Sequence, residues 1–133
     1  MKSRDTLIRL KRFQAEEKRR RVAQIEAMLA EFARMVGDLD REIAIEEQRS
    51  GITDMSHFAY STYARAARVR RDNLKQSTDD LRPQLADART MLTEALEELG
   101  KAQNLDVREK GDRLEPLRER ADLDMTGLVA SRL

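Results

Sequence analysis

The chain has 133 residues, of which 38% are charged and 4% are aromatic, with only five Gly and two Pro. A compact globular core needs more large apolar side chains, whereas charged, periodic chains with little Gly favour long helices. The formal net charge is only +1, which argues against a protein that binds polyanions over its whole surface. Cysteine is absent, so disulfides and thiolate metal sites are excluded.

The first residues, MKSRDTLIRLKRF, carry too many charges for the apolar core of a signal peptide. No stretch approaches the ~18 consecutive apolar residues that a membrane span requires. We therefore expect a soluble protein of the cytoplasm that does not insert directly into a membrane.

The first predicted element is a helix over residues 5–49. Between Val22 and Ile43, apolar residues recur at alternating steps of three and four, which places them on one stripe of a helix, the seam of a left-handed coiled coil. The stripe continues more weakly back to Ile8, and Gly37 lies within it at a cost of about 1 kcal/mol relative to Ala. The strong seam residues are Val22, Ile25, Leu29, Phe32, Val36, Leu39 and Ile43.

A hinge is predicted over residues 50–55, because the pattern stops at the turn-forming residues from Ser50 to Asp54. Gly51 suits a left-handed helix C-cap, and Asp54 or Ser56 can cap the next helix. A second helix is predicted over residues 56–115, followed by a frayed, flexible tail over residues 116–133. Its seam is Tyr60, Ala64, Ala67, Arg71, Leu74, Thr78, Leu81, Leu85, Ala88, Leu92, Ala95, Leu99 and Ala102.

Charge predicts how the two helices pair. Residues 2–21 hold nine basic and three acidic groups, and residues 22–49 hold three basic and seven acidic groups. In the second helix the order reverses, with a net +3 over residues 55–82 and −3 over residues 83–109. An antiparallel fold sets opposite charges against each other, whereas a parallel pair sets like against like. We therefore predict an all-α, long antiparallel two-helix coiled-coil hairpin, in which facing residue numbers sum to about 105.

Catalytic, cofactor and metal sites are not predicted. His57 is the only histidine and lies beside the hinge, where we expect an exposed or capping role. Adjacent carboxylates such as Glu46 and Glu47 point about 100° apart around a helix, so we expect them to lie on solvated faces of the helix. A thin two-helix protein encloses no substrate, and we expect a protein that is not an enzyme and works through its surface.

Two clusters are candidate partner-binding surfaces. The first is basic and invites comparison with a basic-zipper DNA binder, but Glu16 and Glu17 interrupt it, and the second helix removes the need for a parallel dimer. It is either a solvated face or a site for an acidic protein. Its residues are Lys11, Arg12, Lys18, Arg19, Arg20 and Arg21.

The second cluster is aromatic and follows the hinge. Phe58, Tyr60 and Tyr63 lie within six residues, and Tyr60 falls on the seam. These rings either staple the hairpin tip closed, or Phe58 and Tyr63 form an exposed anchor for a partner.

The N-terminal sequence LIRLKRFQAEEKRRRVAQIEAML fits the pattern L-x-R-L-x-x-F-x-x-x-E-x-x-R and is followed by a hinge and a second long helix with a charged tail. In these features the chain resembles the FliJ family of flagellar export proteins, in a short version. The resemblance implies an antiparallel two-helix coiled coil similar to the central stalk of rotary ATPases.

The resemblance also implies partners: the hexameric flagellar export ATPase, the cytoplasmic domain of the membrane export gate, and export chaperones. It implies a cytoplasmic protein peripherally associated with the inner face of the cell membrane at the flagellar base. The alternatives are a general coiled-coil adaptor or homodimerising scaffold and, third, a nucleic-acid-binding helical hairpin.

Overall fold

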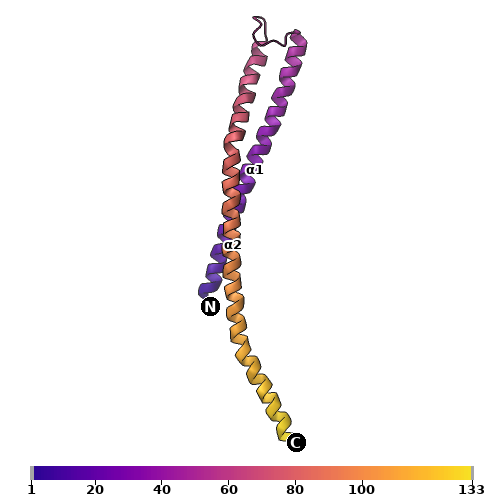
Figure 1. Ribbon diagram of the computed structural model, residues 1–133. Helices are drawn as coiled ribbons and strands as arrows, with labels where there is room; N and C mark the ends of the chain where they lie inside the picture. The colour runs from indigo at the N-terminus through magenta and orange to yellow at the C-terminus, as the bar shows by residue number, and fades with distance from the viewer. Residues whose placement is uncertain (1, 133) are drawn as a thin grey trace. The chain divides into compact units, whose positions relative to one another are not determined.

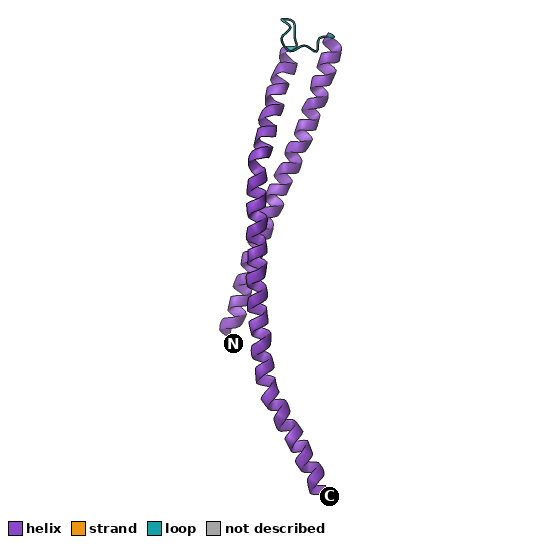
Figure 2. Ribbon diagram, in the orientation of Figure 1, coloured by secondary structure: helices purple, strands orange, loops and turns teal. Residues whose placement is uncertain are grey.

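The computed structural model consists of two long helices, α1 (Lys2–Ser50) and α2 (Thr62–Arg132), joined by a loop (Figure 2). It describes the backbone of residues 2–132 and the side chains of residues 3–112. No strand occurs in the described backbone. The two helices pack against each other, which confirms the predicted all-α helical hairpin.

The chain divides into two compact units, which are described separately. The loop unit comprises residues 17–92 and contains the connection between the helices. The terminal unit comprises residues 1–16 and 93–133. In the loop unit, α1 and α2 run antiparallel and lie side by side below the loop that joins them (Figure 1).

The core of the loop unit consists of the two predicted seams. One cluster contains Val22, Ile25, Leu81 and Ala88, and the other contains Leu39, Ile43 and Ala67. Ile25 is the most buried large side chain, at 1% exposure. Leu29, Phe32, Leu74, Leu85 and Leu92 pack against these clusters and are half-buried. A two-helix core leaves the edges of its larger side chains wet, so Phe32 is not fully enclosed.

Within the terminal unit, α1 and α2 pair through small core residues. Ala15 of α1 and Ala102 of α2 are buried there. Two ion pairs join the helices beside them: Arg4 Nε lies 2.9 Å from Glu109 Oε2, and Lys11 Nζ lies 3.8 Å from Glu98 Oε2.

The interhelical ion pairs follow the predicted charge pattern. In the terminal unit α1 supplies the cations. In the loop unit α1 supplies the carboxylates, and Glu26, Asp40 and Glu47 pair with residues of α2. Their partners are Arg89, Arg71 and Arg68, respectively. Each exposed pair contributes at most about 1 kcal/mol, but all of them would be lost in a parallel arrangement.

The connection between the helices is longer than the predicted hinge over residues 50–55. Gly51, at φ +73°, ends α1, and its N–H donates to the Glu47 carbonyl at 2.9 Å. The second helix was predicted to start near residue 56, but α2 begins at Thr62. The intervening residues form further turns, which are held by hydrogen bonds of Asp54 and His57. The residue that caps α2 is Ser61, whose Oγ accepts from the Ala64 N–H at 3.2 Å, in place of Asp54 or Ser56.

The longer loop also shifts the register. Glu26 pairs with Arg89 and Glu47 with Arg68, so facing positions lie further along α2 than the predicted register allows. Leu39 shares a cluster with Ala67, as that register required. The predicted register placed Phe32 near Thr78 or Asn73, but Phe32 packs against a cluster whose α2 members are Leu81 and Ala88. Each residue added to the loop shifts the residue of α2 that faces a given residue of α1 further along the chain. The longer loop therefore accounts for the change of register.

The far end of α2 also differs from expectation. The backbone is helical through Pro116 to Arg132, beyond the predicted helix end at 115. Side chains of residues 113–133 lie outside the described part, so the flexibility expected for residues 116–133 stays a prediction. Within the part that is described, neither helix has a segment apolar and long enough to cross a membrane.

Two glycines provide a matched test of these helix assignments. A Cβ at Gly37, inside α1, would meet only Arg41 Nη1 at 3.9 Å, so Gly37→Ala should stabilise the chain by about 0.5–1 kcal/mol. Gly51 has positive φ, and Gly51→Ala should destabilise it by about 1–2 kcal/mol. Thermal or urea unfolding followed by circular dichroism measures both. Equal signs for the two substitutions would contradict the end of α1 at the loop.

Candidate interaction surfaces

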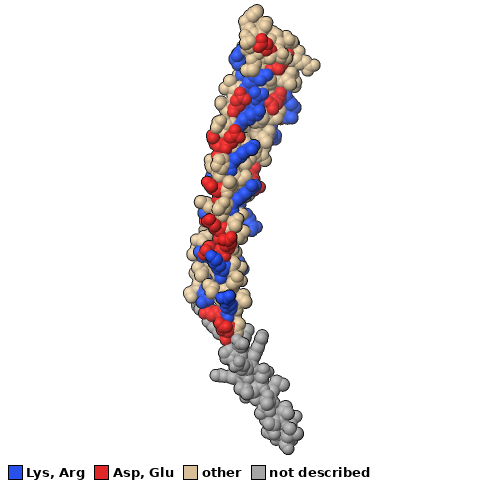
Figure 3. Space-filling model, in the orientation of Figure 1, with Lys and Arg blue, Asp and Glu red and all other residues tan. Residues whose placement is uncertain are grey.

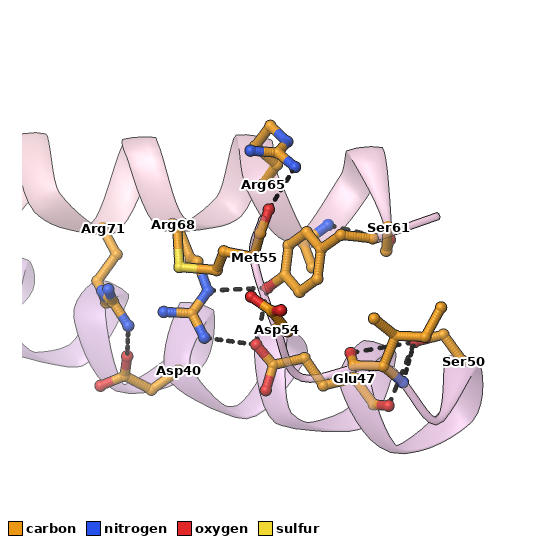
Figure 4. Close-up of polar contacts among 12 residues, drawn as sticks. Asp40, Glu47, Ser50, Asp54, Met55, Ser61, Arg65, Arg68 and Arg71 are labelled. Carbon is orange, nitrogen blue, oxygen red and sulfur yellow. Dashed lines mark hydrogen bonds and ion pairs between the residues drawn. The ribbon is translucent and has the colours of Figure 1, made fainter. Parts of the chain in front are cut away.

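A polar clasp ties the two helices together beside the loop. Tyr60 is 5% exposed, and its hydroxyl donates to Glu47 Oε1 at 2.7 Å. Arg68 Nε donates to the Tyr60 hydroxyl at 2.8 Å, and Arg68 Nη2 also pairs with Glu47. Figure 4 shows Arg68 and, one turn further, Arg71 reaching from α2 to carboxylates of α1. The bonds from Arg68 and Tyr60 hold the pKa of the Glu47 carboxyl below its usual range.

The loop between the helices is held by local hydrogen bonds. Asp54 Oδ1 accepts from the Ser56 N–H at 3.0 Å and from the Ser56 hydroxyl at 2.7 Å, and these bonds lower the Asp54 pKa. His57 N–H donates to the Asp54 carbonyl at 3.1 Å, and the Ala59 N–H donates to His57 Nδ1 at 3.0 Å. His57 therefore has the local capping role that we expected. The loop conformation is specified by its own side chains.

The three aromatic residues after the hinge have different roles. Tyr60 closes the tip, which is the stapling role. Phe58 is 96% exposed, and among the described side chains it is the His57 ring that stacks on it, with ring centroids 4.8 Å apart. A phenyl ring left in water forgoes about 1.5–3 kcal/mol of burial. Phe58 therefore matches the second interpretation, an aromatic side chain available to a partner.

Tyr63 lies on the side of the hairpin in a shallow surface groove. Its ring is 56% exposed, and its hydroxyl donates to Glu42 Oε2 at 3.0 Å, which raises the Tyr63 pKa. Ile45, Glu46 and Arg49 complete the lining of this groove. Phe58 is not among its lining residues, so the two predicted aromatic anchors do not share one site.

The predicted basic cluster falls in both units. In the terminal unit, Lys11 is half-buried and pairs with Glu98, whereas Arg12 is exposed. In the loop unit, Lys18 is half-buried at the seam. Arg19, Arg20 and Arg21 are exposed, and Arg21 Nη1 donates to Gln24 Oε1 at 3.1 Å. The arginine side chains at 19–21 therefore face away from the core, while both lysines help to cover it.

An apolar face of α1 in the terminal unit is exposed. Leu7, Leu10 and Phe13 are 40%, 49% and 58% exposed and recur every three residues. Arg9 and Arg12 lie between them in sequence and are also exposed. Ile8, which lies on the seam, does not belong to this face. The face combines exposed apolar side chains with the exposed basic side chains of Arg9 and Arg12 on neighbouring turns.

No group of three His, Asp or Glu residues within residues 3–112 could hold a metal ion. On the face that Figure 3 shows, basic and acidic side chains alternate along the described part of the chain. The candidate sites are therefore the three surfaces that depart from this mixture: the exposed arginines at 19–21, the ring of Phe58 and, in the terminal unit, the exposed side chains of Leu7, Leu10 and Phe13.

Glu47 was predicted to lie on a solvated face, and this was wrong: its side chain is only 15% exposed and pairs with Arg68. Two further residues important at the loop, Arg65 and Arg68, were not singled out from the sequence. Glu47 and Arg68 flank the seams at positions where antiparallel helices exchange charges, and a correct register would have paired them. Arg65 donates from Nη2 to the Met55 carbonyl at 2.8 Å, and its guanidinium lies 5.4 Å from the centre of the Tyr60 ring. The sequence offered no signal for that bond, because it depends on the path of the loop.

No family model, curated protein or solved structure matches this chain. Its function must therefore be inferred from the residues themselves.

The clasp predicts a specific dependence of stability on pH. The Glu47 pair contributes stability above the unfolded-state pKa of about 4.3, and this is lost as the pH falls through the lower folded-state pKa. Glu47→Gln should therefore lower the melting temperature at pH 7 and lower it less at an acidic pH below the unfolded-state pKa, because wild-type Glu47 becomes progressively protonated there. Asp79→Asn, at an exposed position of α2, is the control and should change neither value. An equal loss at both pH values for Glu47→Gln would show that Glu47 does not act through its charge.

Proposed function

We propose that the chain is a non-enzymatic coiled-coil component of the flagellar type III protein export apparatus. In this role it is a stalk or escort that binds the hexameric export ATPase and the cytoplasmic domain of the membrane export gate, and it supports flagellum assembly and motility. Export chaperones are further partners. The protein acts in the cytoplasm, peripherally associated with the inner face of the membrane at the flagellar base.

The observation that carries the proposal is the antiparallel two-helix hairpin combined with the N-terminal pattern of Leu7, Arg9, Leu10 and Phe13. A two-helix hairpin is the architecture that the resemblance implies for a stalk. In the structure, Leu10 and Phe13 are about half exposed, so the pattern does not serve the seam alone. Residues that core packing does not explain are expected at binding surfaces.

The surface proposed for the ATPase is the basic part of α1. Arg19, Arg20 and Arg21 are exposed, and in the terminal unit Arg12 is exposed as well. Residues 2–21 carry nine basic and three acidic groups, more positive charge than the facing part of α2 can neutralise. A positive surface of this kind fits an acidic sleeve, and it speeds encounter more than it deepens affinity.

Charge reversal tests this surface. Arg19→Glu combined with Arg20→Glu should weaken ATPase binding by about tenfold or more at low salt and reduce motility. Helicity and melting temperature should stay close to wild type, because both side chains point away from the core. Binding is measured with the purified ATPase by calorimetry at two salt concentrations.

The matched control is Lys75→Glu combined with Arg82→Glu, which reverses two exposed cations of α2 in the loop unit. Arg68 and Arg71 are unsuitable for this purpose, because both pair across the helices and their reversal would disturb the fold. If the control pair abolished ATPase binding and the Arg19 and Arg20 pair did not, the proposed surface would be wrong.

Two other functions have distinct outcomes. A general adaptor or homodimerising scaffold would not bind the export ATPase in a pull-down. A nucleic-acid-binding hairpin would shift DNA or RNA in a gel, with an affinity that falls steeply as salt rises.

A further inference from the structure

We propose that the loop between α1 and α2 is a second interaction site, in which Phe58 enters an apolar pocket of a protein partner and Arg65 pairs with a carboxylate at the rim of that pocket. This site is independent of the basic surface of α1 that we assign to the ATPase.

The exposure of Phe58 is a feature of an ordered loop. The segment around it is fixed by the bonds of Asp54 to Ser56, of His57 to Asp54 and of Ala59 to His57. The Tyr60 N–H also donates to the His57 carbonyl at 3.1 Å. Because these bonds fix the loop backbone before binding, presenting Phe58 to a partner costs little loop entropy, which is a property of an interface anchor.

The neighbourhood of Phe58 indicates the chemistry of the partner. Met55, on the same loop, is 42% exposed and is a second apolar side chain in contact with water there. Arg65 is bound to the Met55 carbonyl and has no carboxylate partner among the described residues. Figure 4 shows this guanidinium against the loop, on the side opposite α1. A partner that accepts Phe58 therefore meets a cation that is bound to the same loop.

Nearby carboxylates do not offset this cation. Glu47 is occupied by Tyr60 and Arg68, and Asp54 is occupied by the Ser56 N–H and hydroxyl. His57 adds a further donor: its Nδ1 accepts from Ala59, so Nε2 carries the proton of the neutral ring. The loop thus carries donors together with an exposed apolar ring, and the complement is a pocket with carboxylate or carbonyl acceptors at its edge.

A lipid surface is the less favoured occupant. Stable binding to a membrane needs a larger apolar face or a cluster of basic residues. The loop offers one fully exposed ring, one methionine and one cation without a carboxylate partner in the described chain. A single ring with directional donors suits a pocket of defined shape, and the contact alone is small enough to be transient.

Photo-crosslinking in the cells that produce the chain tests the site. Phe58 is replaced by benzoylphenylalanine, and the same residue at exposed Val69 of α2 is the control. Position 58 should give one discrete protein adduct and position 69 none. Mass spectrometry should place the crosslink in an apolar pocket with an Asp or Glu at its rim.

Substitutions at position 65 separate the charge from the loop bond. Arg65→Glu should reduce the adduct at position 58 by about tenfold, whereas Arg65→Lys should retain most of it. Arg70→Glu, at another exposed cation of α2, should leave it unchanged. With the identified partner purified, Phe58→Ala should weaken binding about tenfold or more, and Phe58→Tyr much less.

Several outcomes would overturn the proposal: no adduct at position 58, an adduct with lipid or with a second copy of this chain, or a crosslink to a surface without a pocket. Equal losses for Arg65→Lys and Arg65→Glu would show that Arg65 only shapes the loop. Because Phe58 variants keep the arginines at 19–21, failure here leaves ATPase binding intact and is distinguishable from failure of the proposed function.

Discussion

The structure depends on the packing of two apolar seams that neither helix can bury alone. A single helix with the stripe of α1 leaves Val22, Ile25 and Ile43 in water, and such a helix is only marginally stable by propensity. Folding back at Gly51 brings α2 against that stripe and buries them. The alanines of α2 matter as much as the larger residues of α1, since small side chains in one seam leave room for bulky ones in the other. Ion pairs such as Glu26 with Arg89 then favour the antiparallel direction at little energetic gain of their own.

Sequence periodicity predicted this core closely, because burial in a coiled coil follows the step of three and four residues. Ala64 and Arg71 were both predicted on the seam: Ala64 is fully buried, and Arg71 is half-buried and pairs with Asp40. The loop could not be predicted in the same way. Its path depends on Asp54 and His57 bonding to backbone groups two or three residues away, and such bonds leave no periodic signal. The register error followed from the loop error.

The candidate sites were predictable to different degrees. The exposed arginines at 19–21 follow from their positions off the seam, and the structure agrees. For Phe58 the sequence left two interpretations open, because the outward direction of a loop side chain depends on the loop conformation. The same conformation places Arg65 at the Met55 carbonyl. The side chains between the two helices of a hairpin stabilise the fold. Its specificity for a partner therefore depends on the side chains that lie outside the seam. In the loop unit these are a basic face on α1 and an aromatic tip.

The antiparallel fold-back within one chain is the central claim, and a distance between spin labels tests it most directly. The chain has no cysteine, so Ala30→Cys and Arg82→Cys, both at exposed positions, can be labelled specifically. Packed helix axes lie about 8–10 Å apart, and the predicted result is one short distance that persists when the labelled chain is diluted with excess unlabelled chain. A single continuous helix would separate these positions by roughly 75 Å. Either that long distance, or a short distance that disappears on dilution, would contradict the hairpin.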